Sequence, residues 1–246
     1  PDVGSSDSQK KGRSLVESRS TQAQRARRHE ADADSVLVIG LGRFGSALAT
    51  TLDSLDRRVL GVERDPDLIR TWSGRIPLVE ADATNPEALE QLGARDFRTV
   101  VVGVGTALEA SVLITGNLVD LGVSQIWTKA ISAEHGRILK RIGAHHVVYP
   151  EYDAGQRVAH LVSGKMLDYI EMEDGFTIVK MKPPKELHGF TVGQAQVRKR
   201  YGVTILGVKA PNVPFQYALD ETRIDAEDVL IVSGDSSLLE RFAARP

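Results

Sequence analysis

The 246-residue sequence contains no cysteine. Disulfide bonds, thiolate metal sites and cysteine nucleophiles are therefore excluded. No apolar run approaches the roughly 20 residues that a membrane-spanning helix needs, and the first residues lack the apolar core of a signal peptide. The formal net charge is only −2 at pH 7, which provides no overall attraction to nucleic acid or anionic lipid. We therefore expect a soluble, cytoplasmic protein of one large or two small domains.

Residues 1–34 lack the apolar periodicity of a folded element, and we expect them to form a disordered, basic tail. Arg25, Arg27 and Arg28 form a basic cluster just before the first predicted strand. The cluster has no interleaved aromatic residues, so nucleic-acid binding is not predicted. Two interpretations stay open: a solvated leader, or an arm that touches an acidic or membrane-bound partner.

The first folded segment combines a strand, a glycine-rich turn and a helix. Residues 36–39 are apolar and mostly β-branched, which predicts a short buried strand. Gly40, Gly42 and Gly45 follow in G-x-G-x-x-G spacing. The first allows a tight turn, the second lets backbone approach a phosphate, and the third lets the helix pack closely on the strand. The helix N-terminus then suits a polyphosphate.

Glu63 ends the second predicted strand. A carboxylate at that position is placed to accept hydrogen bonds from ribose hydroxyls and to repel a 2′-phosphate. Strand, glycines, helix and acid in this order predict a nucleotide site. The alternative is a nucleotide-free α/β turn with Glu63 as a solvated strand end.

Strands and helices alternate from residue 35 to residue 150, which predicts an α/β domain with a doubly wound, parallel, Rossmann-type sheet. Ligands of such sheets bind at the carboxyl ends of the strands. The candidate residues at these ends are Gly40–Gly45, Glu63, Asp82–Thr84 and Gly105. We therefore expect one nucleotide-binding domain over 35–150.

The pattern changes after Pro150. A single helix is expected over Asp153–Ile170, within a linking and dimerisation segment at 151–174. Its apolar stripe must be buried against a second subunit or against its own domain. Residues 175–246 predict a second, smaller α+β domain, with strands at 176–182, 203–209 and 228–234 and a helix over Thr191–Tyr201.

Read in order, several short segments resemble the RCK family, whose members regulate the conductance of potassium. The likeness covers about residues 35–245, and these segments are Ile39–Gly45, Ala81–Thr84, Ala110–Ser111, Lys129–Ala130, Ile142–Ala144 and Tyr201–Leu206. The chain is most similar to the cytosolic gating subunits of Ktr/Trk potassium-uptake systems. The resemblance implies a non-enzymatic regulator at the inner face of the cell membrane, activated by ATP and inactivated by ADP. It also implies homodimers that assemble into an octameric ring beneath a membrane potassium channel.

The resemblance also implies roles for individual residues. Arg43 is expected to sense the γ-phosphate, often across the dimer, and Lys129 to lie near the phosphates. The predicted cofactor-binding residues are Gly40, Leu41, Gly42, Arg43, Phe44, Gly45, Glu63, Arg64, Asp82, Ala83, Thr84, Gly105 and Lys129. Cyclic di-AMP is implied as a second ligand of the C-terminal domain, with Arg198 contacting its phosphate. The alternative for Arg198 is a basic, exposed helix end.

No catalytic residue and no metal ligand is predicted. Just before Ile142–Ala144, where the resemblance leads us to look for a cation-binding acid, the sequence has Lys140, which cannot ligate a metal. Glu63 fits NAD as well as ATP, so two alternatives stay open: an NAD-dependent oxidoreductase and an NAD(H)-binding redox sensor. Against the oxidoreductase, no histidine paired with a carboxylate is evident beside a hydride acceptor.

Overall fold

A computed structural model of the chain describes residues 35–105, 107–164 and 166–246. The tail predicted at residues 1–34 lies outside the described residues. The chain divides between Pro150 and Glu151 into two compact units.

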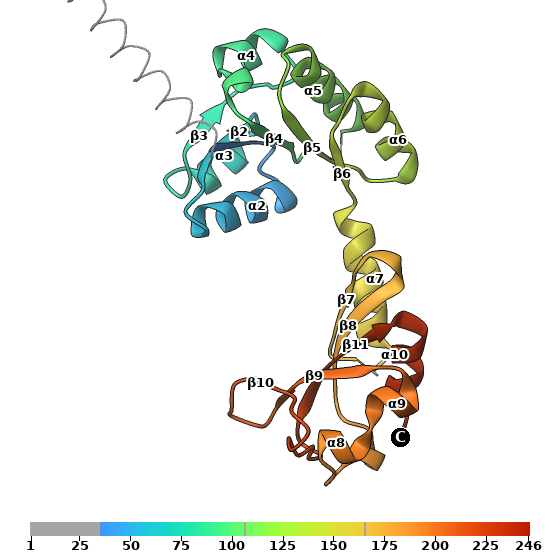
Figure 1. Cartoon of the computed structure of the whole chain (residues 1–246). Coiled ribbons are helices and arrows are strands. Elements are labelled where there is room, and N and C mark those ends of the chain that lie inside the picture. The colour runs from blue at the N-terminus through green and yellow to red at the C-terminus, as the bar shows by residue number, and fades with distance from the viewer. Residues whose placement is uncertain (1–34, 106, 165) are drawn as a thin grey trace, which may run out of the picture. The chain divides into compact units, whose positions relative to one another are not determined.

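The first unit is built on a parallel, six-stranded sheet in the order β3-β2-β1-β4-β5-β6 (Figure 1). Its strands are β1 (Ser35–Ile39), β2 (Arg58–Glu63), β3 (Leu78–Glu80), β4 (Thr99–Val102), β5 (Gln125–Lys129) and β6 (His146–Val148). The strand order reverses between β1 and β4, and such a switch point opens a crevice at the carboxyl ends of the strands. The predicted doubly wound parallel sheet is confirmed.

Helices cover both faces of this sheet. They are α2 (Arg43–Ser54), α3 (Pro66–Trp72), α4 (Pro86–Gln91), η1 (Ala94–Asp96), α5 (Leu108–Asp120) and α6 (Ala133–Ile142). Val38 packs in a cluster with residues of α2 and α3, whereas its neighbours Leu37 and Ile39 pack with α4 and α5. Because successive strand side chains point to opposite faces, this alternation places the two groups of helices on opposite sides.

The second unit contains an antiparallel, five-stranded sheet in the order β10-β9-β11-β8-β7. Its strands are β7 (Asp168–Glu171), β8 (Phe176–Met181), β9 (Thr204–Lys209), β10 (Gln216–Tyr217) and β11 (Val229–Asp235). Its helices are α7 (Pro150–Val162), η2 (Glu173–Gly175), η3 (Lys185–Leu187), α8 (Val192–Ala195), α9 (Val197–Tyr201) and α10 (Ser236–Ala243). Apolar residues of the sheet and of α10 form one core, including Val179, Val232 and Phe242. The predicted smaller α+β domain is therefore confirmed as a fold.

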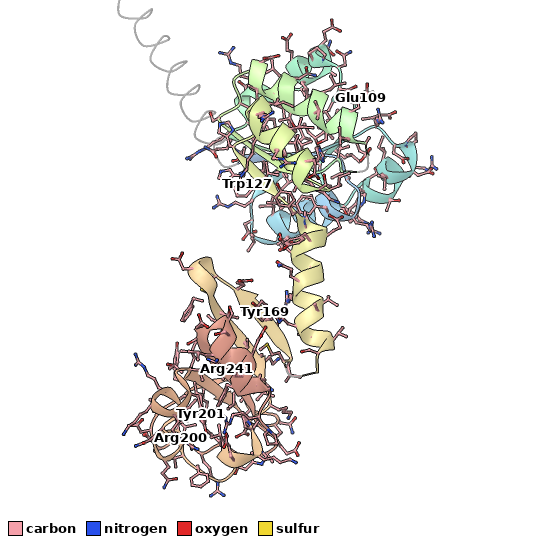
Figure 2. The ribbon with its side chains drawn as sticks, turned by 90° about the vertical axis from the view of Figure 1, so that its right-hand side faces the viewer. Glu109, Trp127, Tyr169, Arg200, Tyr201 and Arg241 are labelled. Atoms are coloured by element: carbon pink, nitrogen blue, oxygen red, sulfur yellow. The ribbon has the colours of Figure 1, made fainter. Side chains whose placement is uncertain are left out.

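The helix predicted over Asp153–Ile170 is wrong in its second half. α7 ends before Gly164, which adopts a φ of +75° that favours glycine, and the chain then forms β7, which pairs with β8. Met166 and Tyr169, which a helix over Asp153–Ile170 would place on its apolar stripe, are instead buried in the core of the second unit. Tyr169, which is labelled in Figure 2, stacks on the His160 ring of α7, and the ring centroids are 3.7 Å apart.

The helix predicted over Thr191–Tyr201 is two short helices. Gln196 lies between α8 and α9 in the left-handed region, with a φ of 45°. Thr191 caps α8 by accepting the Gln194 amide, and Gly202 ends α9 with a φ of 73°. The start and the end of the predicted segment are thus where the sequence placed them, and only the break was missed.

Candidate functional site

The turn between β1 and α2 is shaped by two glycines. Gly40 has a φ of +87° and donates its amide to the Val62 carbonyl over 2.8 Å. A β-carbon on Gly45 would lie 1.9 Å from the Gly40 carbonyl oxygen, so only glycine lets the helix approach the strand this closely. Gly42 precedes α2 without a side-chain cap, and the first turn of α2 contains no acidic residue. The positive end of the helix is therefore left for an external anion.

A cavity of about 470 Å³ opens at the carboxyl ends of β1, β2, β3, β4 and β5. The predicted residues that line it are Gly40, Gly42, Arg43, Phe44, Glu63, Arg64, Asp82, Ala83, Thr84, Gly105 and Lys129. Leu41 and Gly45 do not line it: Leu41 is fully buried in the core, and Gly45 packs against Gly40. Arg198 is elsewhere, exposed on α9 in the second unit.

Glu63, at the end of β2, is buried and accepts backbone amides with both carboxylate oxygens. Oε2 accepts from Leu41 over 2.7 Å, and Oε1 accepts from Arg64 and Asp65 over 2.8 and 3.0 Å. A carboxylate has about four acceptor positions, so one remains for a ligand hydroxyl. Glu63 is consequently both a structural bridge and a candidate ribose contact.

Asp82 and Arg64 form a second polar group at the cavity wall. Asp82 Oδ1 accepts the amide and the hydroxyl of Thr84 over 3.0 and 2.8 Å, and Oδ2 lies 3.3 Å from the Arg64 guanidinium. The two Thr84 hydrogen bonds, with a lesser contribution from Arg64, hold the pKa of Asp82 below its ordinary value, although burial acts in the opposite direction. Asn117 of α5 donates to the Thr84 carbonyl over 3.0 Å and fixes this loop. Asp82 therefore presents a charged acceptor to a ligand amine.

Cations gather on the α2 and β5 side of the cavity. The Lys129 ammonium lies 5.9 Å from the centroid of the Phe44 ring. The Lys129 side chain passes so close to Gly105 that a β-carbon there would meet its Cε at 3.0 Å. Together with Arg43 at the start of α2, Lys129 gives this side of the cavity two positive groups. Polyphosphate is the ligand chemistry that matches them.

Several cavity residues were not predicted from the sequence: Ile39, Val62, Asp65, Leu68, Ala81, Gly103, Val104, Ala107, Ala110 and Ile114. Two of them carry a local signal. Asp65, two residues after Glu63, caps α3 by accepting the Asp67 amide. Gly103 lies close to the turn between β1 and α2, where a β-carbon would meet the Gly40 carbonyl oxygen at 2.9 Å. The apolar lining residues are placed by packing and have no signal of their own.

The two sequence-adjacent histidines make separate contacts. His145 Nδ1 accepts the Ile126 amide over 3.1 Å, and His146 stacks on Trp127 with ring centroids 3.9 Å apart. Over the described ranges, no three His, Cys, Asp or Glu side chains gather as a metal-binding group. Over the same ranges, no helix is both long enough and apolar enough to cross a membrane.

Comparison with known proteins gives matches to both units. Residues 36–150 match the TrkA-N domain and residues 176–245 the TrkA-C domain. The Ktr system potassium uptake protein C of Bacillus subtilis (strain 168) is 35% identical over 210 residues, which cover 85% of this chain and 95% of that protein. The crystal structure of the GsuK RCK domain aligns with a TM-score of 0.61 at 18% identity over 87% of this chain, which spans 48% of that one. The GsuK channel bound to NAD aligns with a TM-score of 0.58 at 18% identity, covering 87% of this chain and 40% of that one.

Proposed function

This chain belongs to the RCK family of TrkA-N and TrkA-C domain proteins that includes the Ktr potassium uptake proteins, and from that membership we propose that it is the nucleotide-controlled gating subunit of a membrane potassium transport system. Its ligand is an adenine nucleotide, with ATP favouring the conducting state and ADP the closed state. The protein itself carries out no reaction. Its partner is a Ktr- or Trk-type membrane subunit.

The cavity at the carboxyl edge of the parallel sheet is the observation that carries this proposal. Two kinds of polar group line it: Glu63 and Asp82 are carboxylates that accept hydrogen bonds, whereas Arg43 in the uncapped first turn of α2 and Lys129 over Phe44 of that turn are cationic. Adenosine offers hydroxyls and an amine to the first group, and a polyphosphate offers negative charge to the second. This division supports a nucleotide of adenosine and phosphates.

Arg43 is the proposed sensor of the γ-phosphate. It lies in the first turn of α2, where a cation opposes the helix dipole by a few tenths of a kcal/mol, and an anionic partner offsets that cost. A guanidinium pairs bidentately with a phosphate. Arg43 can therefore make this interaction with the γ-phosphate when ATP is bound but not when ADP is bound. A ligand shifts a conformational equilibrium only by such a difference in affinity between states.

A homodimer is the proposed unit of response, and an octameric ring the proposed assembly. α7 follows directly on the nucleotide-binding unit and has no buried residue in the chain by itself. Val158 and Val162 lie one turn apart, with 52% and 79% of their surface exposed. An apolar stripe left open in this way supports burial against a second copy.

Two further ligands follow from particular residues. NAD(H) is the second candidate for the cavity, because Glu63 is placed for the adenosine ribose of either nucleotide and a protein with this fold, the GsuK channel, has been solved with NAD. Cyclic di-AMP is proposed for the second unit, where Arg198 is exposed in the last turn of α9.

Calorimetric titration of the purified chain with ATP, ADP and NADH tests the nucleotide proposal. We expect micromolar ATP and ADP binding, and Arg43→Ala should weaken ATP by about tenfold more than ADP. Arg95→Ala is the matched control, because Arg95 is exposed in the same unit and does not line the cavity. Strong NADH binding without a preference for ATP over ADP would replace the ATP switch by the redox sensor. Absence of binding by all three ligands would overturn the nucleotide proposal.

A further inference from the structure

The buried carboxylate of Glu63 continues the β1–β2 ladder beyond the ends of the strands. Within the ladder, Ile39 pairs with Val62, and the Gly40 amide donates to the Val62 carbonyl over 2.8 Å. The chain then turns away at Gly40, whose φ is +87°. The next amide, that of Leu41, is bound by Glu63 Oε2 over 2.7 Å in place of a strand carbonyl.

The same carboxylate holds the turn that follows β2. Oε1 accepts the amides of Arg64 and Asp65, so one side chain joins the two turns that border the cavity. The Leu41 side chain is fully buried and lies against β2, where a β-carbon on Gly61 would meet its Cδ1 at 3.0 Å. Without the carboxylate, the Leu41 amide would be a buried donor that has lost its partner, which costs more than an ordinary hydrogen bond contributes.

We propose that Glu63 is a positioning residue for the phosphate end of the cavity: its carboxylate fixes the Gly40–Gly42 turn so that the start of α2 presents its amides to phosphate. This role is separate from a contact with the ribose, and it rests on the nucleotide binding proposed above. The two ends of the ligand site are consequently coupled through one side chain. A change at the ribose end alters affinity for phosphates that it never touches.

A glutamate can accept hydrogen bonds from both turns at once, whereas the two most similar residues, glutamine and aspartate, cannot. Glutamine has one acceptor oxygen, and its NH₂ group would face an amide donor, so it loses either the Leu41 bond or the bonds to Arg64 and Asp65. Aspartate keeps the charge but is one methylene shorter, so it cannot bridge both turns. Glu63→Gln and Glu63→Asp therefore test the bridge with and without loss of charge.

The ligand that separates the two roles is 2′,3′-dideoxy-ATP, which has the phosphates of ATP and no ribose hydroxyls. We expect Glu63→Gln to weaken 2′,3′-dideoxy-ATP by about tenfold or more, because the carboxylate acts on the phosphate turn, and to weaken ATP at least as much, because ATP also loses a ribose contact. Equal binding of 2′,3′-dideoxy-ATP by wild type and Glu63→Gln would overturn the proposal and leave Glu63 as a ribose contact only. Glu80→Gln is the matched control, since Glu80 pairs with Glu63 across β2 and β3, is exposed and does not line the cavity.

Hydrogen exchange at the Leu41 amide gives a readout that needs no ligand. We expect Glu63→Gln and Glu63→Asp to speed exchange at Leu41 while the amides of β1 keep their protection, which also shows that the unit remains folded. Unchanged protection of Leu41 in both variants would overturn the proposal. A different result would be a wild-type protein that binds neither nucleotide although Glu63 still protects the Leu41 amide. That result would overturn the proposed nucleotide function, and the role of Glu63 in phosphate binding would fall with it.

Discussion

The ammonium group of Lys129, at the end of β5, lies over the ring of Phe44 in the first turn of α2, 5.9 Å from the ring centroid. The contact joins the end of β5 to the first turn of α2, and both residues line the cavity. Gly105 leaves space for the Lys129 stem to pass. A flexible cation is thereby held at one place.

Replacing Lys129 by methionine should therefore weaken nucleotide binding in proportion to ligand charge. We expect a loss of about fivefold for ATP, less for ADP and little for AMP, as befits a half-exposed cation. Titration calorimetry at two salt concentrations measures the three affinities, and the loss should shrink at high salt. Lys140→Met is the control, because Lys140 is exposed on α6 away from the cavity. Equal losses for all three nucleotides would contradict the assignment.

Alanine should affect stability at Gly45 and phosphate affinity at Gly42. At Gly45 the new β-carbon would overlap the Gly40 carbonyl oxygen at 1.9 Å, so Gly45→Ala should lower the free energy of unfolding of the first unit by about 1–3 kcal/mol. At Gly42 no atom lies within 4 Å of the new carbon and φ is −61°, so Gly42→Ala should fold normally. It should nevertheless lose phosphate affinity, because its methyl group occupies the place where backbone approaches the ligand.

Thermal unfolding and nucleotide titration of both variants check this pair. Wild-type nucleotide affinity in Gly42→Ala would show that phosphate does not approach this turn. Wild-type stability in Gly45→Ala would show that the helix and the strand can separate without cost.

The sequence predicted the first unit well because its signals are local. The glycine spacing after residues 36–39 reports the turn in which these glycines lie, and Glu63 marks the end of its own strand. Asn85 followed by Pro86 is an equally local signal for a helix start, and in the structure Asn85 caps α4 by accepting the Glu87 amide. Fold class and most cavity residues therefore followed from short segments. No local signal shows that the Glu63 carboxylate binds the Leu41 amide, because this bond joins the end of β2 to the turn after β1, 22 residues earlier in the chain.

The errors arose where distant partners decide the structure. The apolar spacing from Val158 to Tyr169 continues a helical period, but Tyr169 gains more from pairing with β8 and from burial in the second core. β10 was missed because two exposed residues, Gln216 and Tyr217, have no pattern apart from their pairing with β9. Likewise, Gln196 breaks the predicted helix in a left-handed conformation that its residue type does not announce.

Glu186 should make the stability of the second unit depend on acid pH. It accepts the Tyr201 hydroxyl over 3.0 Å and pairs with both Arg245 and Arg200. Both guanidinium groups also lie over the ring of Tyr201, which Figure 2 labels together with Arg200. The Arg245 hydrogen bond, with a lesser contribution from that of Tyr201, lowers the pKa of Glu186, although burial acts in the opposite direction. A lowered pKa in the folded state stabilises the fold above the ordinary value of about 4.3, and this contribution is lost as pH falls through the folded pKa.

Comparison of wild type with Glu186→Gln isolates this contribution. We expect wild type to unfold a few degrees higher at pH 7, with a difference that stays constant down to about pH 5 and vanishes at still lower pH. Scanning calorimetry across this range measures it, and the other acids titrate in both proteins, so their effects cancel. A difference independent of pH would show that Glu186 contributes through packing and not through its charge.

Val162 should control self-association if α7 is the dimer contact. On one side α7 is tied to its own unit, by Arg157 to Asp168 and by His160 to Tyr169. Val158 and Val162 remain exposed. A glutamate at 162 would have to be desolvated in a helix-to-helix contact, so Val162→Glu should raise the dimer dissociation constant by at least about tenfold without lowering monomer stability.

Sedimentation equilibrium measures the dimer dissociation constant. Leu55→Glu, at an exposed leucine just after α2, is the control and should dimerise as wild type does. Unchanged association of Val162→Glu would place the contact elsewhere, and a monomeric wild type would refute the dimer itself.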